Sequence, residues 1–356
     1  MTNAEIIRYR LFNQQIAGTK FTQPKQIVEW MVAMQAQEYA IAKWAIGLRL
    51  PGSTDEQVEK AFTDGEILRT HLMRPTWHFV TPADIRWLLK LTAPRVEAFN
   101  AFTYRQQELD NKIFKRSNDI IAKSLEGGKH LLRTELQTAL KQKKITADGI
   151  RLSVLMMKAE LDGIICSGPR RGNQFTYSLL YERVPTVKTI SKEEALQQFA
   201  FRYFRSRGPA TVKDFATWSG LTVKEGIAGA AMLPSHFIHE NINGQEYIFY
   251  PASFTSGKMQ SSFLMPDYDE YGMGYKDRSA IFTAKMAFTQ FKNENPFFNR
   301  MVILDGKIQG TWKRVIKNNK VVVETVPFGP LSKTKQQALK KAIKKYCAFV
   351  GKQIEK

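Results

Sequence analysis

The sequence predicts a mainly α-helical protein with short β-hairpins, an α+β fold. Several apolar-periodic runs begin with a serine or threonine that stands three positions before a glutamate, glutamine or aspartate, the pattern of a capped helix start. Pairs of short strand-like runs are joined by glycine- or asparagine-containing turns. With 356 residues, 43% hydrophobic and 12% aromatic, the chain is long enough for two or three domains and too apolar for wholesale disorder.

The first predicted unit spans residues 1–81. Apolar periodicity predicts a helix over residues 3–14, and a second helix begins at Pro24, since proline favours the first helical turn. A capping box at residues 54–57 starts a third helix. Residues 68–80 alternate like two strands interrupted by a proline.

The second predicted unit, residues 82–188, ends in a recognisable module. Residues 132–143 and 149–162 are predicted helices, followed by strand-like residues 163–166 and 174–178. Helix, turn, helix and a hairpin with a basic tip is the layout of a winged helix. In that layout the second helix can enter a DNA groove while the hairpin touches the backbone.

The third predicted unit, residues 189–255, repeats this layout. Capping boxes at 211–214 and 222–225 flank a glycine turn, and a hairpin follows over 237–250, with Asn-Gly at 243–244. The layout thus occurs twice, and we predict that residues 1–81 form a further such unit, which gives three tandem winged-helix domains. The alternative for any single copy is a winged helix used only for packing or protein contact.

The last predicted unit, residues 256–356, has a different character. Residues 301–304, 307–314 and 321–326 are strand-like, and residues 331–350 form a lysine-rich closing helix. The sequence therefore predicts a β-rich C-terminal segment with a terminal helix.

The charge balance indicates a polyanionic partner. The chain has 53 Lys and Arg against 33 Asp and Glu, a formal net charge of +20 with a sequence pI near 9.8. Such an excess on a folded protein favours nucleic acid as the partner first and an anionic membrane surface second. The alternative is a soluble basic protein without a polyanionic partner.

Other classes of protein are disfavoured by what the sequence lacks. The two cysteines, Cys166 and Cys347, are far apart, so neither a disulfide framework nor a cysteine metal site is expected. The five histidines show no metal-ligand spacing, and no phosphate loop or nucleophile elbow occurs. No signal peptide or apolar run of membrane-spanning length is present. We expect a cytoplasmic, nucleoid-associated protein that needs no metal or cofactor.

Two uncharged amides, Gln35 and Gln37, close the apolar run that begins at Pro24. On a regular helix they would lie on different faces, since residues two apart do not face each other. A site that uses both therefore requires the helix to end near Gln35 and the chain to run extended through Gln37. The alternative is that Gln35 is a hydrogen-bonded residue at the rim of a core and Gln37 is simply exposed.

Four motifs occur together in one order along the chain. They are QAQ at 35–37, RTHLMRPTWHFV at 69–80, PDYDEY at 266–271 with GYKDR at 274–278, and DGKIQGTW at 305–312. Together they closely resemble the AlkZ/YcaQ-like winged-helix DNA glycosylases, over nearly the whole chain. Pro75 stands where that family more often has glycine.

The resemblance implies a fold, an activity and an active site. Members of this family stack three winged helices around a basic concave surface and hydrolyse the N-glycosidic bond of alkylated purines, including cross-linked ones. Their active-site motif is Gln-apolar-Gln in the AlkZ-like branch and Gln-apolar-Asp in the YcaQ-like branch. The match implies Gln35 and Gln37 as catalytic residues that orient water, and it points to the AlkZ-like branch.

Further residues are expected at the site. Those expected to bind DNA or substrate are Arg74, His78, Arg170, Arg171, Lys313, Arg314, Lys317, Asn318, Asn319 and Lys320. Those expected to line the site are Asp267, Asp269 and Tyr271, for which a capping or salt-bridging turn is the alternative. We expect a monomer acting on double-stranded, alkylated DNA. A non-catalytic winged-helix regulator or scaffold, and a basic protein-interaction module, are the other interpretations.

Overall fold

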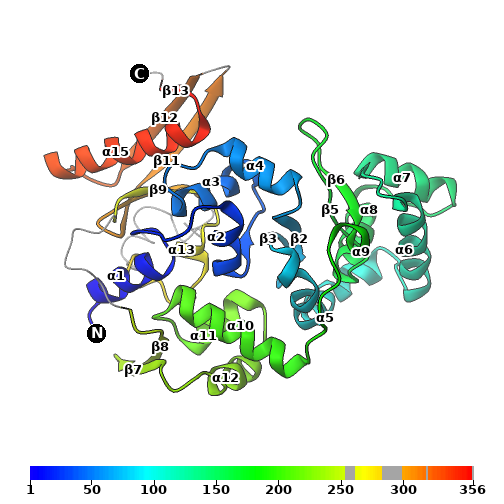
Figure 1. The fold of residues 1–356 in the computed structure, drawn as a ribbon, viewed down its shortest axis with the longest axis horizontal. Coiled ribbons are helices and arrows are strands. Elements are labelled where there is room, and N and C mark those ends of the chain that lie inside the picture. The colour runs from blue at the N-terminus through cyan, green and yellow to red at the C-terminus, as the bar shows by residue number, and fades with distance from the viewer. Residues whose placement is uncertain (253–260, 283–298, 318–319, 355–356) are drawn as a thin grey trace. The chain divides into compact units, whose positions relative to one another are not determined.

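The computed structural model describes residues 1–252, 261–282, 299–317 and 320–354 (Figure 1). The predicted α+β class is confirmed, because the described chain combines helices with small, mostly antiparallel sheets. Among the residues that the structure describes, none of the helices combines the length and the apolar composition that a membrane span requires.

The chain forms two compact units, one nested within the other along the sequence. Unit 1 contains Met1–Glu59, Gln197–Trp218 and Thr222–Lys356, and unit 2 contains Lys60–Leu196 and Ser219–Leu221. The predicted division into four parts, with boundaries after residues 81, 188 and 255, stays a prediction.

Unit 1 is built from helices of all three of its chain segments. They are α1 (Asn3–Asn13), α2 (Pro24–Met31), α3 (Tyr39–Arg49), the start of α4 (Asp55–Thr63), most of α10 (Lys192–Arg207), α11 (Val212–Ser219), α12 (Val223–Ala231), α13 (Glu270–Met273) and α15 (Lys333–Val350). The expected capping boxes are present, for example between Thr222 and Glu225, where each side chain bonds the backbone N–H of the other. Helix α3 was not anticipated from the sequence.

A five-stranded sheet and a separate hairpin complete unit 1. The sheet has the order β13 (Gln353–Ile354), β12 (Lys320–Pro327), β11 (Lys307–Lys317), β10 (Met301–Leu304) and β9 (Phe263–Met265), and the hairpin pairs β7 (Ile238–Ile242) with β8 (Gln245–Phe249). The predicted turn at Asn243 has φ of 52° there and 77° at the following glycine, and the turn at Asp305 has φ of 53° and 73°. Two successive positive φ angles are the type I′ geometry that suits the twist of paired strands.

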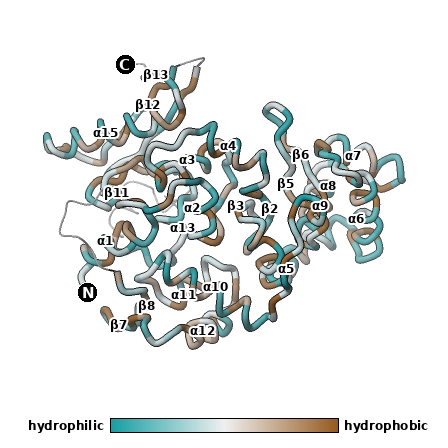
Figure 2. Tube along the Cα trace, viewed as in Figure 1, coloured by the Kyte–Doolittle hydropathy of each residue, from teal (hydrophilic) through white to brown (hydrophobic). Residues whose placement is uncertain are grey.

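Helix α15 covers part of the unit 1 core with one face. Hydrophobic and hydrophilic residues alternate along it in Figure 2, and Tyr346 and Phe349 are buried. The ring of Trp44 on α3 lies 5.3 and 5.2 Å from those of Tyr346 and Phe349. Its indole N–H donates to the carbonyl of Leu264 in β9 at 2.7 Å, so α3 is fixed both to the sheet and to the closing helix.

Unit 2 contains the helices and strands that lie in the sequence between the first and second segments of unit 1. They are β2 (Leu68–Leu72), β3 (Thr76–Val80), α5 (Pro82–Gln106), α6 (Asn111–Leu125), β4 (Leu131–Leu132), α7 (Arg133–Gln142), α8 (Gly149–Leu161), β5 (Ile165–Ser167), β6 (Thr176–Leu179) and α9 (Leu180–Arg183). The predicted strand-like stretch 68–80 is an antiparallel hairpin with Leu68 opposite Val80. Helices α7 and α8 and strands β5 and β6 follow in the order expected of a winged helix, an assignment that stays a prediction.

Candidate active site

Helix α2, which precedes the two amides, ends earlier along the chain than expected. The helix ends at Met31, and Val32 has φ of 67° and ψ of −56°. The N–H of Ala33 donates to the carbonyl of Met31 at 2.8 Å, which closes a γ-turn of the strained, positive-φ kind. A β-branched residue in such a conformation costs about 1–3 kcal/mol, so surrounding contacts must hold it there.

The chain then runs extended through a two-residue strand, β1 (Met34–Gln35), before helix α3 begins at Tyr39. A site that uses both amides requires the helix to end near Gln35 and the chain to run extended through Gln37. The helix ends at Met31, and the extended strand ends at Gln35, two residues before Gln37. The helix ends four residues earlier than the apolar pattern indicates, because Val32 turns the backbone away from the helical path.

A buried ion pair of unit 1 holds this segment in place. Arg207 and Glu270 lie 2.7 Å apart with side chains that are 0% and 1% exposed. Glu270 Oε1 accepts the backbone N–H of Gln35 at 3.0 Å, while Arg207 donates to the carbonyls of Met31 at 2.9 Å and Ala33 at 3.0 Å. The bonds therefore fix backbone groups on both sides of the turn.

The two amide side chains differ in exposure. Gln35 is 6% exposed, and within the described part of the chain its Oε1 atom has no hydrogen-bond partner. Gln37 is half-buried and its neighbour Glu38 is exposed. An amide oxygen accepts up to two hydrogen bonds, and buried polar atoms normally have partners. Gln35 therefore offers an acceptor on a rigid backbone.

Two of the three residues expected to line the site, Asp269 and Tyr271, make buried structural contacts. Asp269 receives two bonds from Arg49, at 2.8 and 3.0 Å, and both side chains are fully buried. Asp269 also accepts the N–H of Tyr271 at 2.8 Å and so caps α13. The Tyr271 hydroxyl donates to the carbonyl of Gly306 at 2.7 Å, and burial raises its pKa. These contacts are the capping and salt-bridging turn that was the alternative.

Asp267 has a different environment. It is paired with Arg300 at 2.9 Å and its side chain is 10% exposed. Burial raises the pKa of this carboxyl, and the charge of Glu38, the residue after Gln37, raises it further against the lowering effect of Arg300. Of the two acids and one phenol expected to line the site, Asp267 thus interacts electrostatically with the residue next to Gln37.

Two expected contact residues lie on the β2–β3 hairpin of unit 2. His78 is completely buried, and its Nδ1 atom is 3.0 Å from the carbonyl of Thr76. Arg74 is half-buried in the connection between the strands, after Met73, which has φ of 63°. Pro75 follows within this turn, where it interrupts no strand pairing.

The remaining expected residues of unit 2 lie between β5 and β6. The Arg170 guanidinium lies 5.0 Å from the centre of the Phe175 ring. Arg171 is exposed and forms an ion pair with Glu135 at 2.8 Å. A phosphate would therefore compete with Glu135 for Arg171.

A pocket of about 400 Å³ opens beside this hairpin in unit 2. Its lining includes Arg69, Trp77, Arg133 and Phe175. The Arg69 guanidinium lies 4.3 Å from the Trp77 ring and 4.6 Å from the Phe175 ring. Cations and aromatic rings side by side are the combination that proteins use against phosphates and bases.

The β11–β12 hairpin of unit 1 carries the other expected basic residues. Lys313 and Lys320 are exposed, and Arg314 is half-buried against the hydroxyl of Tyr346. Lys317 stands opposite Lys320 in the strand register. The expected residues Asn318 and Asn319 lie outside the described residues.

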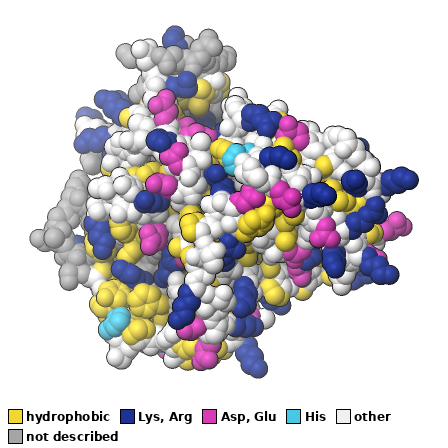
Figure 3. All heavy atoms as spheres, turned by 45° about the vertical axis from the view of Figure 1, so that its right-hand side comes forward, with side chains coloured by type: hydrophobic (Ala, Val, Ile, Leu, Met, Phe, Trp, Pro, Cys, Tyr) yellow, Lys and Arg dark blue, Asp and Glu magenta, His cyan; other side chains and the backbone are white. Residues whose placement is uncertain are grey.

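Lys and Arg side chains are spread over one face of the molecule in Figure 3, with Asp and Glu side chains between them. Among the described residues, no group of three or more His, Cys, Asp or Glu side chains is placed to hold a metal ion. Cys166 and Cys347 are both buried and unpaired with each other.

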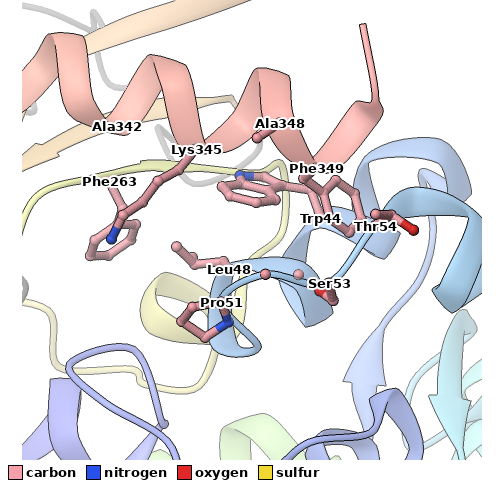
Figure 4. Close-up of a pocket in the computed structure, with 12 residues that line it drawn as sticks. Trp44, Leu48, Pro51, Ser53, Thr54, Phe263, Ala342, Lys345, Ala348 and Phe349 are labelled. Atoms are coloured by element: carbon pink, nitrogen blue, oxygen red, sulfur yellow. The ribbon is translucent and has the colours of Figure 1, made fainter.

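A second pocket, of about 200 Å³, lies between α3 and α15 in unit 1 (Figure 4). Trp44, Phe263 and Phe349 line it, and the Lys345 side chain extends toward Phe263. Burial lowers the pKa of Lys345. Neither amide of the candidate site lines this pocket.

Two residues of the site were missed by sequence reasoning. Glu270 lies inside the PDYDEY motif, so the motif contained the signal without indicating which of its acids matters. Arg207 is the last residue of α10 and belongs to none of the four motifs, so nothing local could have identified it.

Comparisons with known proteins give a consistent result. The model of the family "DNA glycosylase AlkZ-like" matches residues 28–349. The chain is 24% identical over 323 residues to an interstrand DNA cross-link repair glycosylase of Streptomyces sahachiroi, covering 86% of each protein. The solved structure of the Streptomyces sahachiroi DNA glycosylase AlkZ superposes with a TM-score of 0.79 at 18% identity, over 100% of this chain and 99% of that one.

Proposed function

The chain belongs to the AlkZ-like DNA glycosylase family, and from this premise we propose that it hydrolyses the N-glycosidic bond of N7-alkylated purines in double-stranded DNA, with Gln35 and Gln37 positioning the attacking water. Interstrand cross-links joined through such purines belong to the same substrate class. The relative from Streptomyces sahachiroi, which is named for cross-link repair, supports this extension.

The chemistry of the substrate explains why amides suffice. Alkylation at N7 gives the purine a positive charge, so the base leaves as a neutral molecule and needs no strong general acid. What remains is to hold a water against the sugar carbon and to stabilise an oxocarbenium-like transition state, which is a matter of positioning and electrostatics. An amide oxygen accepts a hydrogen bond from that water, and its NH₂ group fixes the geometry. Because an amide is a poor proton acceptor, the site should not release a neutral, unalkylated nucleobase.

One observation carries this proposal. The Oε1 atom of Gln35 is buried and has no hydrogen-bond partner within the described residues, while the backbone N–H of the same residue is fixed by Glu270 at 3.0 Å. A buried acceptor on a rigid backbone is suited to binding one water in one orientation.

We further propose that DNA phosphates contact Arg170, Arg171 and the β11–β12 hairpin. Lys317 and Lys320 stand directly opposite each other in that hairpin. The exposed Lys313 and Lys320 place positive charge on the same hairpin, which favours an anionic partner. The net charge of +20 acts in the same direction.

The test is release of N7-alkylguanine from a duplex oligonucleotide under single-turnover conditions, read as abasic sites. Gln35→Ala and Gln37→Ala should each slow release about a hundredfold, the effect of removing one preorganised polar group from an active site. Gln336→Ala, which removes an exposed glutamine of α15, is the matched control and should release base at the wild-type rate. Equal rates for all four proteins would remove the amide pair from the mechanism. Sequence-selective binding without any base release by the wild type would favour the regulator or scaffold.

The substrate range has its own test. A duplex that carries an unmodified guanine, one that carries a monoadduct and one that carries an interstrand cross-link would be compared at equal concentration. We expect release from the second and third and none from the first. Release of unmodified guanine would contradict a mechanism that depends on a cationic leaving group.

A further inference from the structure

We propose that Glu270 and Arg207 are positioning residues for the Gln35 amide, so that a buried ion pair sets the geometry of the site. The inference rests on the proposed function of Gln35. Neither side chain needs to touch DNA, because both act through the backbone of residues 31–35.

Glu270 uses both oxygens of its carboxylate. Oε1 accepts the N–H of Gln35 at 3.0 Å. Oε2 accepts from Arg207 Nε at 3.1 Å, from Arg207 Nη2 at 2.7 Å and from the indole N–H of Trp218 at 2.7 Å. Three donors hold one oxygen in place, and the other oxygen is thereby aimed at a single peptide group.

Arg207 fixes the turn that precedes this peptide. Its two terminal nitrogens donate to the carbonyls of Met31 and Ala33, which flank Val32. The guanidinium also lies 4.1 Å from the centre of the Trp218 ring, which prevents it from swinging away. The strained φ of Val32 is therefore held from both sides.

The neighbouring pair Arg49–Asp269 shows that burial alone does not explain this arrangement. It is equally buried, yet Arg49 donates its other bonds to the carbonyl of Ala45 and the side chain of Gln14, away from the amide segment. A buried ion pair adds little net stability compared with well-packed apolar residues. The specific feature of Arg207–Glu270 is that one carboxylate oxygen and both terminal guanidinium nitrogens also bond the backbone of the segment that presents Gln35.

The effect of such positioning on the rate of base release can be estimated. A displacement of about 1 Å in a reacting group can cost about a hundredfold in rate. Loss of the Glu270 bond frees the Gln35 peptide by such a distance without removing its side chain. The rate of base release should therefore fall, while the affinity for DNA should not.

Glu270→Gln is the most specific variant. The single oxygen of the new amide should remain with its three donors on Arg207 and Trp218, which leaves an NH₂ group facing the N–H of Gln35. Two donors then face each other and the peptide must move. Arg207→Lys is the second variant, since an ammonium has three donors and cannot reproduce the five bonds that the planar guanidinium makes to Glu270, Ser206 and the Met31 and Ala33 carbonyls.

Arg49→Lys is the matched control, because it weakens an equally buried ion pair that does not contact the amide segment. The readouts are the single-turnover rate of base release, the Kd for duplex DNA and the thermal midpoint. We expect Glu270→Gln and Arg207→Lys to slow release about a hundredfold with Kd within twofold of wild type. Arg49→Lys should lower the thermal midpoint by a similar amount and keep the wild-type rate within threefold.

A double-variant cycle separates positioning from general damage. If Glu270 acts through Gln35, Glu270→Gln should change the rate less than twofold when Gln35 is already alanine. Should Glu270→Gln not fold, Trp218→Phe replaces it, since loss of one donor loosens the same carboxylate and should slow release about fivefold. Equal rates for wild type and both ion-pair variants, or an equal rate loss in Arg49→Lys, would overturn the inference while leaving the proposed function standing. A wild type that releases no base would instead refute the proposed function, and the inference with it.

Discussion

The proposed role of the β11–β12 hairpin gives a quantitative prediction for Lys313→Ala combined with Lys320→Ala. Both lysines are exposed on this hairpin. Each phosphate contact that a lysine makes contributes about 0.9 to the slope of log affinity against log salt. Loss of two contacts should reduce the magnitude of that slope by about 1.8. Between 50 and 200 mM salt, the loss of affinity in the double variant should then be about twelvefold smaller than the loss in wild type.

The assay is fluorescence anisotropy of a labelled duplex titrated at several salt concentrations. Lys60→Ala is the control, because this lysine is 74% exposed but already paired with Asp64 at 2.6 Å. It should leave the slope within about 0.3 of the wild-type value. An unchanged slope in the double variant would refute phosphate contact by this hairpin. A slope lowered equally by Lys60→Ala would show that only net charge matters.

Two other predictions concern stability. Gly220→Ala should lower the free energy of unfolding by more than about 2 kcal/mol, because φ is 74° and the new Cβ would lie 2.1 Å from the carbonyl oxygen of Met73. Gly244→Ala is the control: φ is 77° but no atom lies within 4 Å of the new Cβ, so the loss should be only about 1 kcal/mol. Equal losses of stability for the two variants in urea denaturation would contradict the steric argument. Asp267→Asn should raise the free energy of unfolding relative to wild type increasingly as pH rises above 3.8. Burial raises the pKa of the Asp267 carboxyl in the folded state above that value, so the wild type loses stability as pH rises through the raised pKa, whereas the asparagine variant does not. A difference between the two proteins that does not vary with pH would show that Asp267 is not buried in this way.

The parts of the fold that could be predicted from sequence depend on neighbouring residues alone. The turn at Asn243-Gly244 requires two positive φ angles, and these residues tolerate them best. The capping box of Thr222 and Glu225 likewise joins side chains and backbone only three positions apart. Such signals place strands and helix starts without knowledge of the rest of the chain.

The geometry of the amide segment could not be predicted in this way. The apolar pattern continues past Met31, and nothing in the identity of Val32 indicates a positive φ. The contacts that impose it come from Arg207, 176 residues away from Met31, and from Glu270, 235 residues away from Gln35. The identity of the amides came from a family motif, whereas their support depends on long-range packing.

The nested arrangement of the two units has a consequence for biosynthesis. Residues 60–196 of unit 2 emerge from the ribosome as one nearly continuous stretch, so local contacts can gather them early. Unit 1 must wait, because Arg49 meets Asp269 only after a further 220 residues have been translated. We expect nascent chains to pass through a stage in which the N-terminal helices lack their ionic partners, and chaperone dependence should be greatest there.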